Sequence, residues 1–311
     1  MTQRIIIGTR GSELALWQAE YVQRVIRENH PGLEVALEII KTKGDKILDQ
    51  ALSKIGDKGL FTREIENALL DGRVDIAVHS LKDLPTETPD GLCIAAITER
   101  EMVNDVLISK HGHSLEQLPD EAVIATGSLR RRAQLLHLRP DLRIVDIRGN
   151  LNTRLEKFDA SDCHAMVLAY AGIARLGLGH RISHVIPTTY ILPAVGQGAL
   201  GVEIRVDDRR VEDIVACLHH SESAAAASAE RAMLRELEGG CQVPIGAYAR
   251  IEKGRLLLDA MVASVDASLR LDTRGSAGDP AKSESLGKRV AKKLLDNGAR
   301  EILDEIRRGG L

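Results

Sequence analysis

Residues 72–87, GRVDIAVHSLKDLPTE, join a short apolar run to a polar turn. The run at residues 74–78 predicts a buried strand, and Lys82 and Asp83 follow it before Pro85. In open α/β sheets, ligands bind beyond the carboxyl ends of the strands. Asp83 is therefore a candidate general acid or base. The alternative is an ordinary turn with a solvated lysine, which the turn preferences of aspartate and proline favour when this stretch is taken alone.

The neighbouring segments alternate between strand and helix patterns. Residues 3–7 and 33–40 predict strands, and apolar residues at helical spacing between positions 14 and 26 predict a helix between them. Residues 61–69 predict a short helix. Residues 41–59 contain several lysines and glycines without periodicity, which predicts a long surface loop. The alternation predicts an α/β fold with a mainly parallel sheet.

The alternation restarts after residue 99. Strands are expected at residues 104–109, 122–126, 143–147 and 165–169, with a helix at 128–138, and the strand-like run 199–206 is expected to return to the first sheet. The last third combines a helix at 222–237, strands at 244–251, 255–263 and 268–275, and a helical tail. We therefore expect two doubly wound α/β lobes, residues 1–99 with 200–217 and residues 100–199, plus a smaller α+β domain at 222–311.

Composition limits the classes of partner. A chain of 311 residues is too long for one ordinary hydrophobic core, which predicts more than one domain. Aromatic residues make up only 2% of the chain, which argues against binding single-stranded nucleic acid by stacking. With a formal net charge of -3, any anion site must be a local cluster. No secretory pattern or membrane-length apolar run is present, so no membrane partner is expected. Four cysteines without CxxC spacing and no metal-binding motif indicate a reducing cytoplasm and no metal site.

Arginines recur at predicted strand ends and helix starts. Paired N–H groups of arginine suit carboxylates and phosphates, and helix starts add backbone N–H groups. Solvated arginine faces are the alternative, which fits Arg132 and Arg139 better than Arg10 and Arg148. The pattern predicts a cleft for a polyanion, lined by Arg10, Arg130, Arg131, Arg148, Arg154 and Arg175.

Cys241 lies in the glycine-rich stretch GGCQVPIG at residues 239–246, between a predicted helix and strand. Flanking glycines leave a sulfur accessible, and a thiolate is a strong nucleophile. A small apolar residue in a tight turn is the alternative, and it fits Cys93, Cys163 and Cys217.

The stretch GQGALG at residues 196–201 matches a dinucleotide-binding pattern, GxGxxG. That motif requires a strand before it and a helix after it. Here Pro193 precedes the glycines and a strand-like run follows them, so we interpret the stretch as a turn between domains.

Taken together and in order, these segments resemble porphobilinogen deaminases across almost the whole chain. The matching stretches are GTRGSELAL, GDKGLFTREIENALLDGRVDIAVHSLKDLPTE, ATGSLRRRAQL, IRGNLNTRL, LAYAGIARLG, LPAVGQGALGVE and AAASAERAMLRELEGGCQVPIGAYA. The resemblance implies three domains. The first two would be similar to the lobes of periplasmic binding proteins, with the active cleft between them. It also implies a cytoplasmic monomer.

The resemblance implies a transferase that joins four porphobilinogen molecules head to tail, releasing ammonia and then the linear tetrapyrrole hydroxymethylbilane. Cys241 would hold a dipyrromethane cofactor, the primer, through a thioether, and Asp83 would be catalytic. Lys54 and Lys58 would belong to a cleft-covering loop at about residues 42–59. Carboxylates of cofactor, substrate and product chain would be bound by Arg10, Ser12, Lys82, Thr126, Ser128, Arg130, Arg131, Arg148, Arg154 and Arg175.

One stretch departs from the family pattern. After Glu99 and Arg100 the family continues with Asp-Pro-Arg-Asp, whereas this chain has EMVND at residues 101–105. The change falls at the first expected hinge between domains. The alternative function is a non-catalytic, two-lobed anion-binding protein, which would not give the colour reaction of a bound pyrrole. A structural or nucleic-acid-binding role is opposed by the net charge and the scarcity of aromatic residues.

Overall fold

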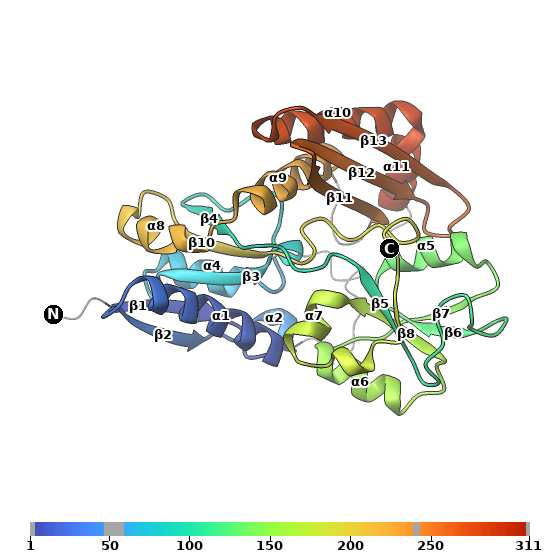
Figure 1. Cartoon of the computed structure of the whole chain (residues 1–311), viewed down its shortest axis with the longest axis horizontal. Coiled ribbons are helices and arrows are strands. Elements are labelled where there is room, and N and C mark those ends of the chain that lie inside the picture. The colour runs from blue at the N-terminus through green and yellow to red at the C-terminus, as the bar shows by residue number, and fades with distance from the viewer. Residues whose placement is uncertain (1–3, 47–58, 239–242, 309–311) are drawn as a thin grey trace. The chain divides into compact units, whose positions relative to one another are not determined.

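The computed structural model describes residues 4–46, 59–238 and 243–308, which fall into two compact units (Figure 1). Unit 1 lies within Met1–Leu48, Asp57–Glu101 and Gly198–Ala224. Unit 2 includes Met102–Gln197 and Ala225–Leu311. The expected division into three domains stays a prediction.

Unit 1 contains a five-stranded sheet in the order β2-β1-β3-β10-β4. β1 (Arg4–Thr9) pairs in parallel with β2 (Glu34–Ile39) and β3 (Ile76–Ser80). β10 (Leu200–Arg205) lies antiparallel between β3 and β4 (Leu92–Ile97). β2, β1, β3 and β4 therefore run in the same direction, as expected for a mainly parallel sheet. β10 alone runs the opposite way, because it returns from a distant part of the sequence.

Helices cover both faces of this sheet because the side chains of its strands alternate. Ile5 and Ile7 pack in one cluster with α1 (Glu13–Asn29) and α8 (Arg209–Val215). The intervening Ile6 packs in another cluster with α4 (Arg63–Leu70). Apolar residues at every position of a strand are typical of a sheet that is buried on both faces. The run RIII at residues 4–7 therefore accounts for the doubly wound arrangement of this unit.

Unit 2 contains a second five-stranded sheet in the order β7-β6-β8-β5-β9. β6 (Val123–Ala125) is parallel to β7 (Arg143–Val145) and β8 (Ala165–Ala169), whereas β5 (Asp105–Ser109) is antiparallel to β8 and β9 (His184–Val185). The helices α5 (Leu129–Leu138), α6 (Leu151–Asp159) and α7 (Tyr170–Arg175) follow β6, β7 and β8 in turn. Each parallel strand therefore leads directly into a helix.

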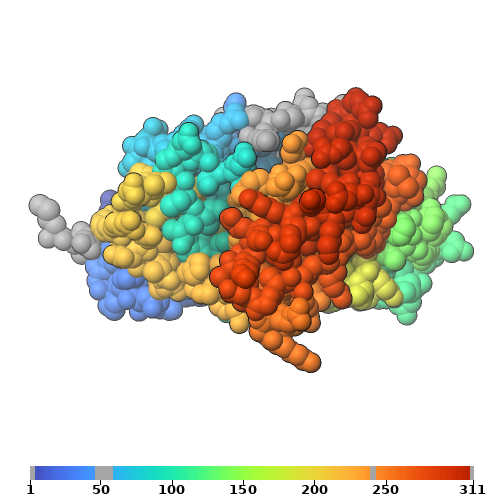
Figure 2. Space-filling view, turned by 90° about the horizontal axis from the view of Figure 1, so that it is seen from above, coloured from blue at the N-terminus to red at the C-terminus, as the bar shows by residue number. Residues whose placement is uncertain are grey.

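The C-terminal part of the chain forms an antiparallel sheet of β11 (Ile245–Glu252), β12 (Arg255–Ala263) and β13 (Arg270–Ala277). Its core is shared with α9 (Ser221–Glu236), α10 (Ser283–Leu294) and α11 (Arg300–Arg308). Gly287 lets α10 approach α9 closely, since a Cβ there would lie 2.3 Å from the carbonyl oxygen of Ala229. Figure 2 shows α10 and α11 within the red surface of this part.

Most predicted elements are present, with ends shifted by a few residues. The prediction for residues 255–263 is confirmed, and the strand predicted at 74–78 runs instead over Ile76–Ser80. Sequence patterns missed β4, β9 and α8. β9 has two residues and α8 carries polar residues on much of its length, whereas β4 is an apolar run of six residues, LCIAAI, that was not assigned. In the predicted loop at 41–59, the short helix α2 (Lys43–Lys46) is described and residues 47–58 lie outside the described residues.

Candidate active site

The carboxyl ends of the parallel strands β1, β2 and β3 meet at one edge of the sheet in unit 1. Arg10 follows β1, and Asp83 ends the 3₁₀ turn Leu81–Asp83 that follows β3. The helix α2 comes soon after β2. The topology thus brings three segments that are distant in sequence to the edge where α/β sheets bind ligands.

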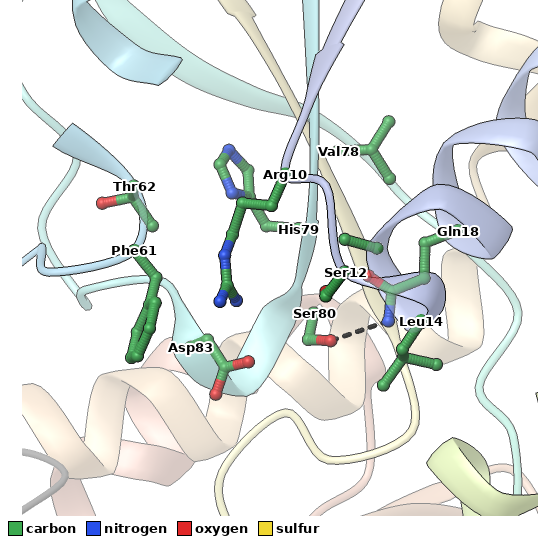
Figure 3. A pocket seen from close by; sticks show the side chains of 11 residues that line it. Arg10, Ser12, Leu14, Gln18, Phe61, Thr62, Val78, His79, Ser80 and Asp83 are labelled. Carbon is green, nitrogen blue, oxygen red and sulfur yellow. Dashed lines mark hydrogen bonds between the residues drawn. The ribbon is translucent and has the colours of Figure 1, made fainter. Parts of the chain in front are cut away.

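A pocket at this edge contains both Arg10 and Asp83 (Figure 3). The side chain of Arg10 extends toward the turn that carries Asp83, and the ring of Phe61 stands beside them. Asp83 is exposed, and its carboxylate has no hydrogen-bond or ion-pair partner among the described residues. It is therefore available to a ligand. The pocket is lined by Arg10, Ser12, Leu14, Ala15, Gln18, Phe61, Thr62, Val78, His79, Ser80 and Asp83.

Two further predicted side chains belong to this edge. Ser12 is the N-cap residue of α1, and because its side chain makes no capping hydrogen bond, its hydroxyl can serve the pocket. Lys82 is half-buried in the turn beside Asp83. Gln18 was not predicted: its Nε2 donates to the hydroxyl of Ser80 at 2.8 Å and so ties α1 to the end of β3.

Arg10 is held by two neighbours inside unit 1. Its Nε donates to Oδ1 of Asp45 at 3.1 Å, and its guanidinium lies 4.3 Å from the centre of the Phe61 ring. Burial alone would raise the pKa of Asp45, but the hydrogen bonds and charge of Arg10 hold it below its usual value. Asp45 is therefore an ionised partner of Arg10 at neutral pH.

Buried acidic residues lie behind the pocket. Glu203 on β10 is 0% exposed, and its Oε2 lies 3.3 Å from Nε2 of His79, close enough for an ion pair but outside hydrogen-bond geometry. Glu66 on α4 is 7% exposed. Burial raises the pKa of Glu66, and the nearby charge of Glu203 raises it further, with His79 opposing. The folded protein therefore retains the Glu66 proton to a higher pH than the unfolded chain does.

This raised pKa predicts a pH dependence of stability. In the unfolded chain the pKa of Glu66 is near its ordinary value of 4.5. Below that pH, Glu66 is protonated in both the folded and the unfolded state, so it adds no pH dependence to folding stability. As the pH rises above that value, the unfolded chain loses the proton first, so folding stability falls. We expect Glu66→Gln to become more stable relative to wild type as the pH is raised from about 4 to 7, as measured by urea unfolding. Glu20→Gln, at an exposed position of α1, is the control and should show no such trend; an equal trend in both variants would contradict the assignment.

The predicted arginines of unit 2 follow the same topological rule. β6, β7 and β8 are parallel, so the loops after them share one edge of the second sheet. Thr126 and Ser128 follow β6, and the Ser128 hydroxyl accepts from the backbone N–H of Arg131 at the start of α5. A Cβ on Gly127 would lie 2.7 Å from Oδ1 of Asp146, which shows how closely the loops after β6 and β7 approach each other.

Three of these arginines remain partly exposed. Arg148 follows β7 and its Nε donates to Oδ2 of Asp146 at 2.8 Å, with its side chain 20% exposed. The Nε of Arg154, on α6, donates to the carbonyl oxygen of Gly149 at 2.8 Å. Arg175 is the last residue of α7. The second sheet edge thus carries several cations and two capped helix starts, an arrangement that suits anions.

Arg130 and Arg131 are placed differently, since both are buried. Their guanidinium groups each lie 2.8 Å from a different oxygen of Asp105, which is 0% exposed. Nε2 of Gln197 also donates to Asp105, at 3.0 Å. Burial alone would raise the pKa of Asp105, but the two arginines hold it far below its usual range. The structure therefore gives Arg130 and Arg131 a partner inside the protein, and their predicted role toward ligand carboxylates stays a prediction.

Several residues of this arrangement were not predicted from the sequence. Asp105 is the last residue of the stretch EMVND, to which the sequence analysis gave no site role, and Asp45, Phe61 and Glu203 were not assigned to a site either. No local pattern marks Asp45 or Glu203. Phe61 is one of only two phenylalanines in the chain, and it follows a glycine-rich stretch, which was a usable signal.

Three predicted residues, Cys241, Lys54 and Lys58, lie outside the described residues. Within residues 4–46, 59–238 and 243–308, no group of three or more His, Cys, Asp or Glu side chains could hold a metal ion. In the same ranges, no helix combines the length and the apolar character needed to cross a membrane.

Comparison with known proteins gives a consistent result over nearly the whole length. The family model "Porphobilinogen deaminase, dipyromethane cofactor binding domain" matches residues 5–213, and "Porphobilinogen deaminase, C-terminal domain" matches residues 224–296. The porphobilinogen deaminase of Chlorobium phaeobacteroides (strain BS1) is 53% identical over 311 residues, covering 99% of both chains. That of Chloroherpeton thalassium is 53% identical over 310 residues, again covering 99% of both chains. The Bordetella pertussis BvgS VFT2 domain is 11% identical over 70% of this chain and 85% of that one, and its TM-score of 0.41 is too low to support an inference.

Proposed function

This chain belongs to the porphobilinogen deaminase family, and from that membership we propose how its own residues serve the reaction. The protein is a transferase of tetrapyrrole biosynthesis with a dipyrromethane cofactor. It joins four porphobilinogen molecules head to tail on that primer and releases ammonia and the linear tetrapyrrole hydroxymethylbilane. A non-catalytic anion-binding role is not favoured, because full-length relatives at this identity carry the name of the enzyme.

The observation that supports the residue assignment is the exposed, unpaired carboxylate of Asp83 in a pocket that also contains Arg10. Arg10 would bind a carboxylate of the substrate, and the carboxylate of Asp83 would lie next to the reacting carbon and nitrogen atoms. Ser12, which lines the pocket, would support the same ligand, and so would Lys82 from the turn that carries Asp83. A cation and a free anion in one pocket fit a substrate that has both carboxylates and an aminomethyl group.

In each addition, the bond between the substrate methylene carbon and its nitrogen breaks, and the nitrogen leaves as ammonia with the electron pair. Positive charge then develops on the substrate pyrrole. The carboxylate of Asp83 would stabilise that charge. A carbon–carbon bond next forms to the terminal pyrrole of the growing chain, whose α-carbon loses a proton, and Asp83 would accept that proton. Asp83 would thus act both as an electrostatic stabiliser and as a general base.

The chemistry of the side chains fits a dipyrromethane, which carries several carboxylate groups. Cations and N–H donors line both sheet edges, and Nε of the buried Arg131 has no hydrogen-bond partner among the described residues. The cofactor supplies the free α-carbon to which the first substrate unit is joined. Its carboxylates, and those of the growing chain, would be held by Thr126, Ser128, Arg130, Arg131, Arg148, Arg154 and Arg175.

We propose Cys241 as the point of attachment, through a thioether. The proposal is supported by its position in the GGCQ stretch, where small neighbours leave the sulfur accessible to a bulky adduct. Cys93, Cys163 and Cys217 are free thiols in the structure, and burial raises the pKa of Cys93, which makes it a poor nucleophile. Lys54 and Lys58 would add positive charge toward the anionic chain.

We also propose a cytoplasmic monomer built of three domains. Free thiols at Cys93, Cys163 and Cys217 support a reducing compartment. The three separate sheets support the three domains, each sheet having its own cluster of apolar residues.

Intact mass spectrometry of the denatured protein tests the attachment site. The wild type should show a mass excess equal to two linked pyrrole units, and Cys241→Ser should show none. Cys217→Ser is the matched control, because this exposed thiol has no proposed role, and it should retain the excess.

Loss of the adduct from Cys217→Ser, or its persistence in Cys241→Ser, would contradict the assignment. If the wild type lacks the adduct, incubation with porphobilinogen decides between two explanations. A deaminase that lacks its primer should gain the adduct and begin to release ammonia, whereas an unrelated binding protein should do neither.

A further inference from the structure

Arg10, the cation of the pocket, is already engaged by a carboxylate of its own chain. Its Nε lies 3.1 Å from Oδ1 of Asp45, and Nη2 donates to the same oxygen. The other oxygen, Oδ2, accepts from the backbone N–H of Thr42 at 3.2 Å and from the Thr42 hydroxyl at 2.8 Å. No step of the proposed reaction uses Asp45, so this pairing requires its own explanation.

Packing holds Asp45 in this position. The N–H of Gly44 donates to the carbonyl oxygen of Leu60 at 2.9 Å. A Cβ on Gly44 would lie 2.2 Å from the ring of Phe61, so a larger residue would push this ring away. The same ring covers the guanidinium of Arg10 at 4.3 Å. The segment that carries Asp45 and the residue that covers Arg10 are therefore packed against each other, which places the carboxylate on the guanidinium.

The pair is nevertheless open to a ligand. The side chains of Arg10 and Asp45 are 23% and 27% exposed. Asp45 occupies the Nε side of the guanidinium, while Nη1 has no hydrogen-bond partner among the described residues. A carboxylate from a ligand could bind beside Asp45 or replace it. A ligand carboxylate that binds beside Asp45 is repelled by its negative charge, and one that replaces Asp45 must first break the ion pair with Arg10. Both effects weaken binding of the ligand.

We infer that Asp45 sets the affinity of Arg10 for the carboxylates of the substrate and the growing chain, keeping it low enough for release. The inference rests on the proposed function, which assigns Arg10 to those carboxylates. A site that repeats one reaction four times must let each carboxylate leave before the next unit binds. Binding that is equally strong in the ground and transition states does not accelerate the reaction, so tighter binding at Arg10 would slow the cycle without helping it.

Steady-state kinetics of the holoenzyme with porphobilinogen test this inference through Asp45→Asn. Asparagine keeps the shape of the side chain and removes its charge. We expect KM to fall by about two- to fivefold, the range that a partly exposed ion pair supports. Enzyme molecules that carry partial chains should also accumulate, as seen by intact mass. If Asp45 instead merely positions Arg10, KM should rise, and a raised or unchanged KM would overturn the inference.

Matched variants keep the test decisive. Asp71→Asn makes the same change at an exposed position of unit 1, and it should leave KM unchanged. Thr42→Val removes one of the hydrogen bonds that hold Asp45 on Arg10. A ligand carboxylate should then displace Asp45 more easily, and because the charge of Asp45 remains, KM should fall by a smaller factor. This variant also serves if Asp45→Asn does not fold. Failure of the proposed function is seen separately: the wild type would then neither carry the primer mass nor consume porphobilinogen.

Discussion

Asp83→Asn is expected to lower kcat by about 10²- to 10⁴-fold, the contribution typical of a positioned general acid or base. Asparagine has nearly the same shape as aspartate, but it can neither accept the proton lost from the α-carbon nor balance the positive charge on the substrate. Because the Asp83 side chain is exposed and has no partner among the described residues, the variant should fold as the wild type does. Activity and stability should therefore separate cleanly.

Rates of product formation and ammonia release are measured. Each rate is divided by the amount of enzyme that carries the covalent dipyrromethane, as determined by intact mass spectrometry. Asp90→Asn is the matched control, since Asp90 is exposed in the same unit and does not line the pocket; its kcat should be unchanged. Near-normal turnover in Asp83→Asn would refute the catalytic assignment. An equal loss in both variants would point to a general effect of lost negative charge.

Asp105→Asn is expected to reduce the free energy of unfolding by about 3–5 kcal/mol, the cost of breaking a buried ion pair from one side. Arg130 and Arg131 are 5% and 6% exposed, and without Asp105 neither buried guanidinium would have an ion-pair partner among the described residues. Asparagine can replace some of the hydrogen bonds but none of the charge. We therefore expect the substitution to lower the stability of the fold, and activity to fall because less of the protein is folded.

Urea unfolding at neutral pH measures this loss. Asp159→Asn is the control, because Asp159 pairs with Arg181 on the surface of the same unit and should cost about 1 kcal/mol or less. The pKa of Asp105 is lowered in the folded protein, so its contribution is complete above the pKa of the unfolded chain, near 3.8, and is lost as the pH falls below it. The difference between wild type and Asp105→Asn should therefore shrink in acid. A loss of under 1 kcal/mol at neutral pH would contradict a structural role for the pair.

Much of the fold could be predicted because it depends on local patterns. The run RIII at residues 4–7 and the AMVLA run at 165–169 are apolar enough to predict buried strands, and the alternation with helical spacing predicts the α/β class. The position of Asp83 could also be predicted, since it follows directly on a strand. β10 shows the limit of this reasoning: its strand pattern was recognised, but the direction in which it joins the sheet depends on pairing with β3 and β4.

By itself, the sequence determined the α/β alternation, the order of the family motifs and the set of cations at strand ends, because these follow from neighbouring residues. Only the tertiary structure decided which charged side chains form ion pairs. Asp105 pairs with arginines that follow a different strand, and Asp45 comes to Arg10 from the segment after β2. A guanidinium has the same sequence signature whether it is exposed to a ligand or buried against a carboxylate. Burial and long-range pairing set its charge balance, and these arise only when the chain has folded.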